Sequence, residues 1–265
     1  MDLVQALVLA IVQGFTEFLP ISSSGHLVLV PVLFGWPDQG LAFDVAVHLG
    51  TLAAVVFYFR HELGPMTRDA LGTLRGGPRT PASDLAWWVL IGTLPAVILG
   101  GLFGGYVAHA LRSPLVIAAT TAGFGLLLWL ADARGARARD ETTLGWRAAL
   151  LIGLAQALAL VPGTSRSGIT ITAALFLGLE RQAAARFSFL LSIPVILAAT
   201  CYELVKLLRE PAPADWLMLG IGALAAGVVA YLTIRGFIAL LGHMGLAPFA
   251  IYRLFLAAVL FWIYA

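Results

Sequence analysis

Two short polar segments interrupt an otherwise apolar sequence, and their side chains are of types that act on phosphate groups. The first segment supplies a carboxylate, three consecutive hydroxyls and a histidine, within Gln13, Glu17, Ser22, Ser23, Ser24, Gly25 and His26. A carboxylate in an apolar segment is costly and needs a partner, a proton or a metal. A serine beside such a base can act as a nucleophile, and a histidine exchanges protons near neutral pH.

The second segment is rich in glycine and hydroxyl groups, and it comprises Pro162, Gly163, Thr164, Ser165, Arg166, Ser167, Gly168 and Thr170. A turn of this kind at the start of a helix presents backbone amides at the positive end of the helix dipole, where anions bind. The guanidinium of Arg166 is a planar, permanently charged donor suited to phosphate oxygens. Together the two segments predict phosphoryl transfer, in which positioning and charge stabilisation dominate catalysis.

The composition of the whole chain indicates a lipid environment for these segments. The 265 residues are 60% hydrophobic and 11% charged, whereas a soluble domain carries about 25% charged residues. The net charge of +2 does not favour nucleic acid, and the single cysteine, Cys201, cannot form an internal disulfide. Because no long polar linker divides the chain, we predict one integral membrane domain over residues 1–265 that is all-α and polytopic.

Six apolar runs are long enough to cross a bilayer as helices. These predicted spans are Leu41–Phe59, Ala86–Tyr106, Pro114–Ala131, Phe187–Leu208, Trp216–Ile234 and Pro248–Ala265. Two further apolar segments, Leu3–Phe34 and Ala148–Leu179, contain the polar stretches with their proline and glycine residues, which break helices. Because non-helical backbone at membrane depth must be covered by protein or line a water-filled cavity, we predict that both are re-entrant helix–loop–helix hairpins.

The distribution of basic residues predicts the orientation in the membrane. The loops Arg60–Asp84 and Asp132–Arg147 are both arginine-rich, and two spans separate them, so they lie on one side. The positive-inside rule places that side in the cytoplasm. If the second hairpin is re-entrant, Arg181, Arg186 and Arg235 lie on the same side, which strengthens the bias.

The two halves of the chain, about 1–131 and 148–265, also resemble each other. Gln13 and the Pro20-to-Gly25 stretch correspond to Gln156 and the Pro162-to-Gly168 stretch. With three full crossings in each half and residues 132–147 as a cytoplasmic linker, the second copy is inverted relative to the first. Inverted repeats with broken helices place their site at the repeat interface near the midplane, so the two polar segments are expected to meet.

The motifs around Glu17 and Arg166 resemble those of the undecaprenyl-diphosphate phosphatase family, also called the bacitracin-resistance protein family. The resemblance extends over nearly the full length and is carried by the segments Gln13 to His26, Pro162 to Thr170, Phe43 to Gly50 and Pro248 to Arg253. It implies hydrolysis of undecaprenyl diphosphate at the outer face of the bacterial inner membrane, which recycles the lipid carrier for cell-wall synthesis and confers bacitracin resistance. It also implies a divalent cation, Mg²⁺ or Ca²⁺, with Glu17 as a ligand. The family has Glu or Gln at the first motif position, and Gln13 here weakens the case for a metal bridged by two carboxylates.

Within this resemblance, Glu17, Ser23, His26 and Arg166 are the expected catalytic residues. Ser23 would attack the terminal phosphorus after activation by Glu17, and Arg166 would hold the phosphate oxygens. His26 would protonate the leaving phosphate or activate water, or would itself be the nucleophile, with Ser23 as a phosphate ligand. The expected substrate-binding residues are Gln13, Ser22, Ser24, Gly25, Thr164, Ser165, Ser167, Gly168 and Thr170.

Two other functions compete with hydrolysis. A secondary transporter or lipid flippase also uses broken helices, with Arg166 binding an anion and Glu17 carrying a proton, but it needs no nucleophile. A type-2 phosphatidic-acid phosphatase would require a histidine six positions after the arginine, where this chain has Thr172.

Several remaining polar and small residues have simpler interpretations. Asp44 and His48, one turn apart at the head of a span, are interpreted as structural or interfacial. Arg253 is interpreted as structural, paired with Glu203 or lining the cavity. The glycines at 100, 101, 104 and 105 would allow close helix packing, either in a homodimer or within the chain.

Overall fold

The computed structural model describes residues 1–111, 113–209 and 215–264, and this part of the chain forms helices without a β-strand. The α-helices are α1 (Leu3–Thr16), α2 (Ser23–Phe34), α3 (Leu41–Tyr58), α4 (Arg60–Leu74), α5 (Pro81–Ala110), α6 (Pro114–Arg134), α7 (Trp146–Ala157), α8 (Arg166–Phe176), α9 (Arg181–Arg209), α10 (Trp216–Leu241) and α11 (Ala247–Tyr264). Two short 3₁₀ helices, η1 (Glu141–Thr143) and η2 (Leu158–Leu160), flank α7.

Six of the described helices are long and apolar enough to cross a membrane, namely α3, α5, α6, α9, α10 and α11. They coincide with the six predicted spans, which confirms an all-α polytopic membrane protein. The helix α5 begins at Pro81 rather than Ala86 because Thr80 caps it: the Thr80 hydroxyl accepts a hydrogen bond from the Ser83 amide at 3.1 Å. Hydropathy marks only the lipid-immersed part of a helix, so α9 and α10 also extend beyond their predicted spans. Ala265, the last residue of the final predicted span, lies outside the described residues.

The segment Arg60–Asp84, expected only as a loop, contains the helix α4, which packs against α5. Ion pairs connect this end of the protein to the linker after α6. Arg186 on α9 pairs with Glu62 at 2.7 Å and with Glu141 at 2.5 Å. The three segments that we predict to be cytoplasmic therefore lie together at one end of the bundle.

The four helices of the two polar segments are too short to span a bilayer alone. The helices α1, α2, α7 and α8 contain 14, 12, 12 and 11 residues. At 1.5 Å per residue they measure about 17–21 Å, against about 30 Å for the hydrocarbon core. Both segments are helix–turn–helix units, as expected from their proline and glycine residues. Their re-entrant insertion stays a prediction.

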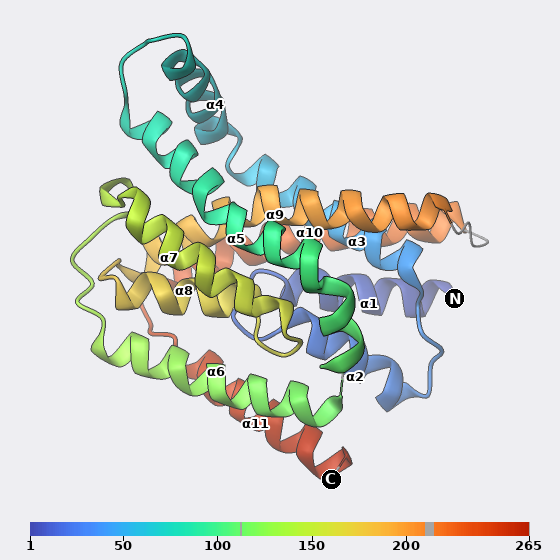
Figure 1. Ribbon diagram of the computed structural model, residues 1–265. Coiled ribbons are helices and arrows are strands. Elements are labelled where there is room, and N and C mark those ends of the chain that lie inside the picture. Colours follow the sequence, from blue (N-terminus) through green and yellow to red (C-terminus); the bar gives the residue numbers. More distant parts are fainter. Residues whose placement is uncertain (112, 210–214, 265) are drawn as a thin grey trace.

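The most extensive helix contacts join the two predicted halves, although some helices, such as α4 and α5, also pack within one half. α3 and α10 form the most extensive contact, α1 packs against α10, α5 packs against α7, and α6 packs against α11 (Figure 1). In the proposed duplication, α1 corresponds to α7, α5 to α10 and α6 to α11. Exchanging the two halves therefore converts the α1–α10 contact into the α7–α5 contact and leaves the α6–α11 contact unchanged. The internal duplication stays a prediction, with which this packing pattern agrees.

The turns that follow α1 and precede α8 are covered by protein. In the first turn, Phe18, Leu19, Ile21 and Ser22 are each at most 5% exposed. Each turn ends on a serine with positive φ, 74° at Ser22 and 67° at Ser165, directly before the next helix. A positive φ is unfavourable for a residue with a side chain, and such strain is retained where the surrounding structure determines it. The two polar turns therefore share one unusual backbone conformation, at the serine directly before α2 and before α8.

Candidate active site

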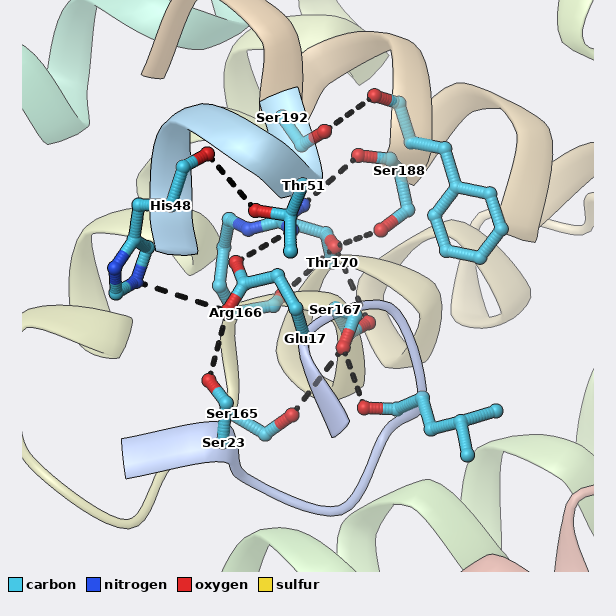
Figure 2. Close-up of polar contacts among 12 residues, drawn as sticks. Glu17, Ser23, His48, Thr51, Ser165, Arg166, Ser167, Thr170, Ser188 and Ser192 are labelled. Carbon is cyan, nitrogen blue, oxygen red and sulfur yellow. Dashed lines mark hydrogen bonds and ion pairs between the residues drawn. The ribbon is translucent and has the colours of Figure 1, made fainter. Parts of the chain in front are cut away.

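Glu17 lies at the centre of the polar cluster, at the C-terminal end of α1. Its Oε2 atom accepts hydrogen bonds from the Ser23 hydroxyl at 2.8 Å and from the Gln13 amide nitrogen at 3.1 Å. Glu17 is 9% exposed and Gln13 is fully buried, so the carboxylate is held within the protein. The turn between α1 and α2 thus returns the first residue of α2 to the last turn of α1 (Figure 2).

Arg166, the first residue of α8, joins the second polar segment to the first. Its guanidinium pairs with Glu17 Oε1 at 3.3 Å and donates to the Ser188 carbonyl oxygen on α9 at 3.2 Å. Its side chain is 12% exposed. The predicted meeting of the two polar turns therefore occurs in the structure, through an ion pair between residues 149 positions apart. Such a buried pair is stable only because both partners stay hydrogen-bonded.

His48 on α3, interpreted from the sequence as structural or interfacial, is a third group that faces Glu17. Its Nε2 atom lies 3.9 Å from Glu17 Oε2, while its Nδ1 atom donates to the Asp44 carbonyl oxygen at 2.7 Å (Figure 2). The imidazole is 34% exposed, so this side of the cluster reaches the protein surface. No sequence periodicity relates His48 to Glu17, because α3 approaches the turn only through tertiary packing.

The predicted substrate-binding residues of the second turn are tied to their neighbours in several ways. Ser165 caps α8 by accepting the Gly168 amide at 3.2 Å, so this amide is already occupied. Ser167 donates to the Leu19 carbonyl oxygen of the first turn at 2.9 Å, and Thr170 contacts the Ser188 hydroxyl at 2.7 Å. The hydroxyl oxygen of Thr164 is buried and has no hydrogen-bond partner among the described residues. Their roles in substrate binding stay predictions.

The remaining predicted residues lie on α2 and just before it. Ser22 is buried, Ser23 is partly buried and Ser24 is exposed, with 3.3 Å between the hydroxyl oxygens of Ser22 and Ser24. Gly25 is buried behind them, and a Cβ atom there would lie 3.5 Å from the Ser22 hydroxyl. The serine triplet thus runs from the buried turn to the surface, with Ser23 in the middle.

His26 does not contact the Glu17 carboxylate, and its two ring nitrogens have other partners. Nδ1 lies 2.7 Å from the Ser22 carbonyl oxygen, and Nε2 lies 2.6 Å from the hydroxyl of Tyr252 on α11. His26 and Ser23 are three residues apart on one helix, so they belong to adjacent positions of the same face. The structure therefore directs the predicted acid–base group towards Tyr252 rather than towards Glu17 or Arg166.

Arg253 on α11 connects both polar turns, and of the two alternatives given for it, pairing with Glu203 is wrong and lining the cavity stays a prediction. It is fully buried, and it donates to the carbonyl oxygens of Thr121 at 3.1 Å, Pro20 at 3.4 Å, Gly163 at 3.1 Å and Thr164 at 2.9 Å. Pro20 belongs to the first turn, and Gly163 and Thr164 belong to the second. The carbonyl groups of Pro20, Gly163 and Thr164 lie outside the helices. One guanidinium binds all three, together with that of Thr121 on α6, because it carries five donors.

Comparison with known proteins gives the same assignment as these motifs. The family model described as bacitracin resistance protein BacA matches residues 6–259. The chain belongs to this family. The undecaprenyl-diphosphatase 2 of Stutzerimonas stutzeri (strain A1501) is 58% identical over 263 residues, which cover 98% of this chain and 97% of that protein. The undecaprenyl-diphosphatases of Thioalkalivibrio sulfidiphilus and Nitrosococcus oceani are each 58% identical over 265 residues, which cover 100% of both chains.

The matched region of the bacitracin resistance protein family includes every residue of the cluster, from Gln13 to Arg253. The resemblance predicted from the two polar segments is confirmed over the whole chain. Within this family member, Glu17, Ser23 and Arg166 form one hydrogen-bonded group, and His48 lies at its edge.

Proposed function

We propose that this chain is an undecaprenyl-diphosphatase, which converts undecaprenyl diphosphate and water into undecaprenyl phosphate and inorganic phosphate. By regenerating the lipid carrier for cell-wall synthesis, this reaction confers bacitracin resistance. One observation carries the proposal: a carboxylate, a serine and an arginine meet within 3.3 Å where two interrupted helices come together. The relatives that share 58% of the sequence bear the name of this activity.

The arrangement of Glu17 and Ser23 supports a serine nucleophile. Ser23 Oγ would form a bond to the terminal phosphorus, while the bond from that phosphorus to the bridging oxygen breaks and undecaprenyl phosphate leaves. The hydroxyl proton would pass to Glu17, whose Oε2 atom already accepts it in a hydrogen bond of 2.8 Å. Water would then attack the phosphoserine, release phosphate and restore Ser23. In the alternative His26 attacks, but both of its ring nitrogens are already in contact with other groups.

Arg166 would bind the oxygens of the phosphoryl group as their negative charge develops. In the described structure its guanidinium neutralises Glu17 and is also held by the Ser188 carbonyl oxygen, so its position is set before substrate arrives. Preorganised donors of this kind are the main source of catalysis in phosphoryl transfer. Entry of a diphosphate would give Arg166 a second anion to bind and would leave Glu17 free to accept the serine proton.

The oxygen atoms near Glu17 fit a divalent cation that arrives with the diphosphate. Glu17 Oε1 accepts only the Arg166 contact, and the neighbouring Gln13 Oε1 atom is buried without a hydrogen-bond partner among the described residues. Mg²⁺ is commonly bound by one or two carboxylates together with substrate phosphates. Glu17 and Gln13 would therefore hold the cation, whose positive charge would stabilise the phosphate oxygens. The described residues contain no group of three histidine, cysteine or acidic side chains that would hold a metal alone.

We further place the protein in the bacterial inner membrane, with the site open to the periplasmic or outer face. The arginine-rich segments at the α4 end support this orientation through the positive-inside rule. His48, which reaches the protein surface, lies in the half of α3 that is farther from α4.

A homodimer is also proposed. Apart from the adjacent residues and backbone of α5 itself, no described atom lies within 4 Å of a Cβ built at Gly101, Gly104 or Gly105. Internal packing thus does not use these three small residues, and a second copy could approach them closely.

Hydrolysis by the purified protein tests the proposed function. The full chain in detergent micelles is incubated with undecaprenyl diphosphate and Mg²⁺, and released phosphate is measured. Glu17→Gln should abolish most of the turnover, while Arg75→Ala, which changes an exposed arginine outside the site, should not. Absence of phosphate release by the folded wild type would contradict the proposal. Turnover without any gradient would in turn exclude a pure transporter or flippase.

Trapping of the covalent intermediate identifies the nucleophile. Rapid acid quenching followed by mass spectrometry should locate phosphate on Ser23. A phosphate on His26 would instead establish the histidine mechanism.

A further inference from the structure

The hydrogen bond between His26 and Tyr252 joins the first polar segment to the last helix of the chain. The hydroxyl oxygen of Tyr252 lies 2.6 Å from His26 Nε2, and the two residues are 226 positions apart. Their rings are nearly parallel, with 8° between the planes and 5.6 Å between the centroids. Neither a motif nor a helical spacing in the sequence links these residues.

The partners of His26 determine which of its nitrogens carries the proton in the neutral ring. The Ser22 carbonyl oxygen can only accept a hydrogen bond, so His26 Nδ1, at 2.7 Å, is the donor. A neutral imidazole carries one N–H group, and Nε2 therefore presents its lone pair. The Tyr252 hydroxyl donates to this lone pair. Of the two ring nitrogens, Nε2 is thus the only base.

The location of Tyr252 shows why it can hold the ring in place. Tyr252 precedes Arg253, which is fully buried and binds carbonyl groups of both polar turns. Successive side chains on a helix point about 100° apart. Two consecutive residues of α11 can therefore contact different groups: Arg253 binds the two polar turns, and Tyr252 binds the histidine. His26 is 9% exposed, whereas Tyr252 is 39% exposed, so the phenol ring covers the histidine on its outer side.

We propose that Tyr252 is a positioning residue for the hydrolysis reaction, which orients the His26 ring and keeps Nε2 as its basic nitrogen. For metal-bound histidines, loss of the partner that fixes the tautomer and orientation of the ring typically costs about 10- to 100-fold in metal affinity or activity, and the same physical reason applies to an acid–base histidine. The expected effect of Tyr252 on turnover rests on the proposed function. The tautomer itself is a property of the protein alone.

Replacement of the hydroxyl alone tests the effect on turnover. Tyr252→Phe keeps the ring and its packing, and kcat should fall about 10- to 30-fold while KM changes less than about twofold. Tyr106→Phe, which removes a hydroxyl from a residue that is 73% exposed, is the matched control and should leave kcat unchanged. A kcat of Tyr252→Phe within twofold of the wild type would overturn the proposal.

A double-mutant cycle distinguishes positioning of His26 from a general structural effect. In a His26→Gln background, Tyr252→Phe should lower kcat by less than about twofold, because the group that Tyr252 orients is already gone. A full additional 10- to 30-fold loss would show that Tyr252 acts independently of His26, which contradicts the proposal.

Nitrogen NMR of the histidine side chains supplies a readout that needs no activity. His26 is assigned by the loss of its signals in His26→Gln, and its Nδ1 should carry the proton at neutral pH. In Tyr252→Phe the Nε2 resonance should shift towards that of a free lone pair. A wild-type ring protonated at Nε2 would overturn the inference even if the enzyme is active. An inactive wild type with the expected tautomer would instead contradict only the proposed function.

Discussion

Ser23 donates its hydroxyl hydrogen bond to Glu17 across a break between two helices, at 2.8 Å. The five residues between them form a buried turn that includes Pro20 and the strained Ser22. In many active sites a third side chain fixes the position of the base relative to the nucleophile. Here the turn holds them, because Arg253 and Ser167 bind carbonyl groups of that turn.

Loss of the Glu17–Arg166 ion pair should remove most of the activity. Glu17→Ala and Arg166→Ala should each lower kcat at least about 100-fold, as expected for loss of a preorganised charge. Arg166→Lys should also lose activity, because an ammonium group cannot reproduce the planar contacts to Glu17 and to the Ser188 carbonyl. Phosphate release in detergent measures each rate. Near-normal rates in both alanine variants would remove this pair from the mechanism.

His48 should contribute to turnover although it lies outside both polar segments. Its Nε2 atom faces Glu17 Oε2 at 3.9 Å, so His48→Ala should lower kcat/KM about tenfold by leaving the carboxylate less well oriented. His61→Ala, an exposed histidine at the start of α4, is the control. Equal kcat/KM values for His48→Ala and the wild type would show that His48 is only interfacial.

Arg253 should be essential for stability. Arg253→Met would leave four buried carbonyl oxygens without this donor, and we expect a loss of about 3–5 kcal/mol in the free energy of unfolding. Denaturant unfolding in detergent, followed by circular dichroism, measures the change. Arg209→Met, at an exposed position, should be nearly neutral. Equal stability of the two variants would contradict the role of Arg253 as the support of both turns.

Gly163 should tolerate no side chain. Its φ is +87°, and a Cβ atom there would lie 2.3 Å from Thr120 Oγ1 and 2.5 Å from the Ile117 carbonyl oxygen. Gly163→Ala should therefore lower the midpoint of thermal unfolding, with a loss of at least about 1–3 kcal/mol from backbone strain alone. Gly123→Ala on α6, where no described atom lies within 4 Å, should preserve or raise that midpoint. A Gly163→Ala protein as stable as Gly123→Ala would show that the turn relaxes freely.

The sequence predicted the elements of the fold more accurately than their ends. Apolar runs of membrane-spanning length identified all six long helices. The start of α5 was missed because it depends on a cap, Thr80 with Ser83, in a polar segment that hydropathy averages away. The helix α4 was missed for a similar reason, since its 15 residues include enough charges to be mistaken for a loop.

The candidate site was predictable only where its residues lie in recognisable local patterns. Glu17, Ser23 and Arg166 lie in polar segments that interrupt apolar sequence. Polar and charged side chains are costly in a membrane segment and are usually functional, so these residues can be recognised from the sequence. His48 and Tyr252 lie in membrane-spanning helices, outside the two polar segments. For Arg253, the sequence suggested Glu203 as one possible partner, which the structure does not show. Their contacts depend on how α3 and α11 pack, which a linear pattern does not contain.

By itself, the sequence determined the membrane environment, the two broken helices and the kind of chemistry, because lipid tolerates polar side chains and non-helical backbone only where they serve a purpose. The tertiary structure decided which groups meet. It brings Arg166 to Glu17, turns His26 towards Tyr252 and places Arg253 beneath both turns. These contacts join residues about 90 to 233 positions apart, and only the packing of whole helices fixes distances over such separations.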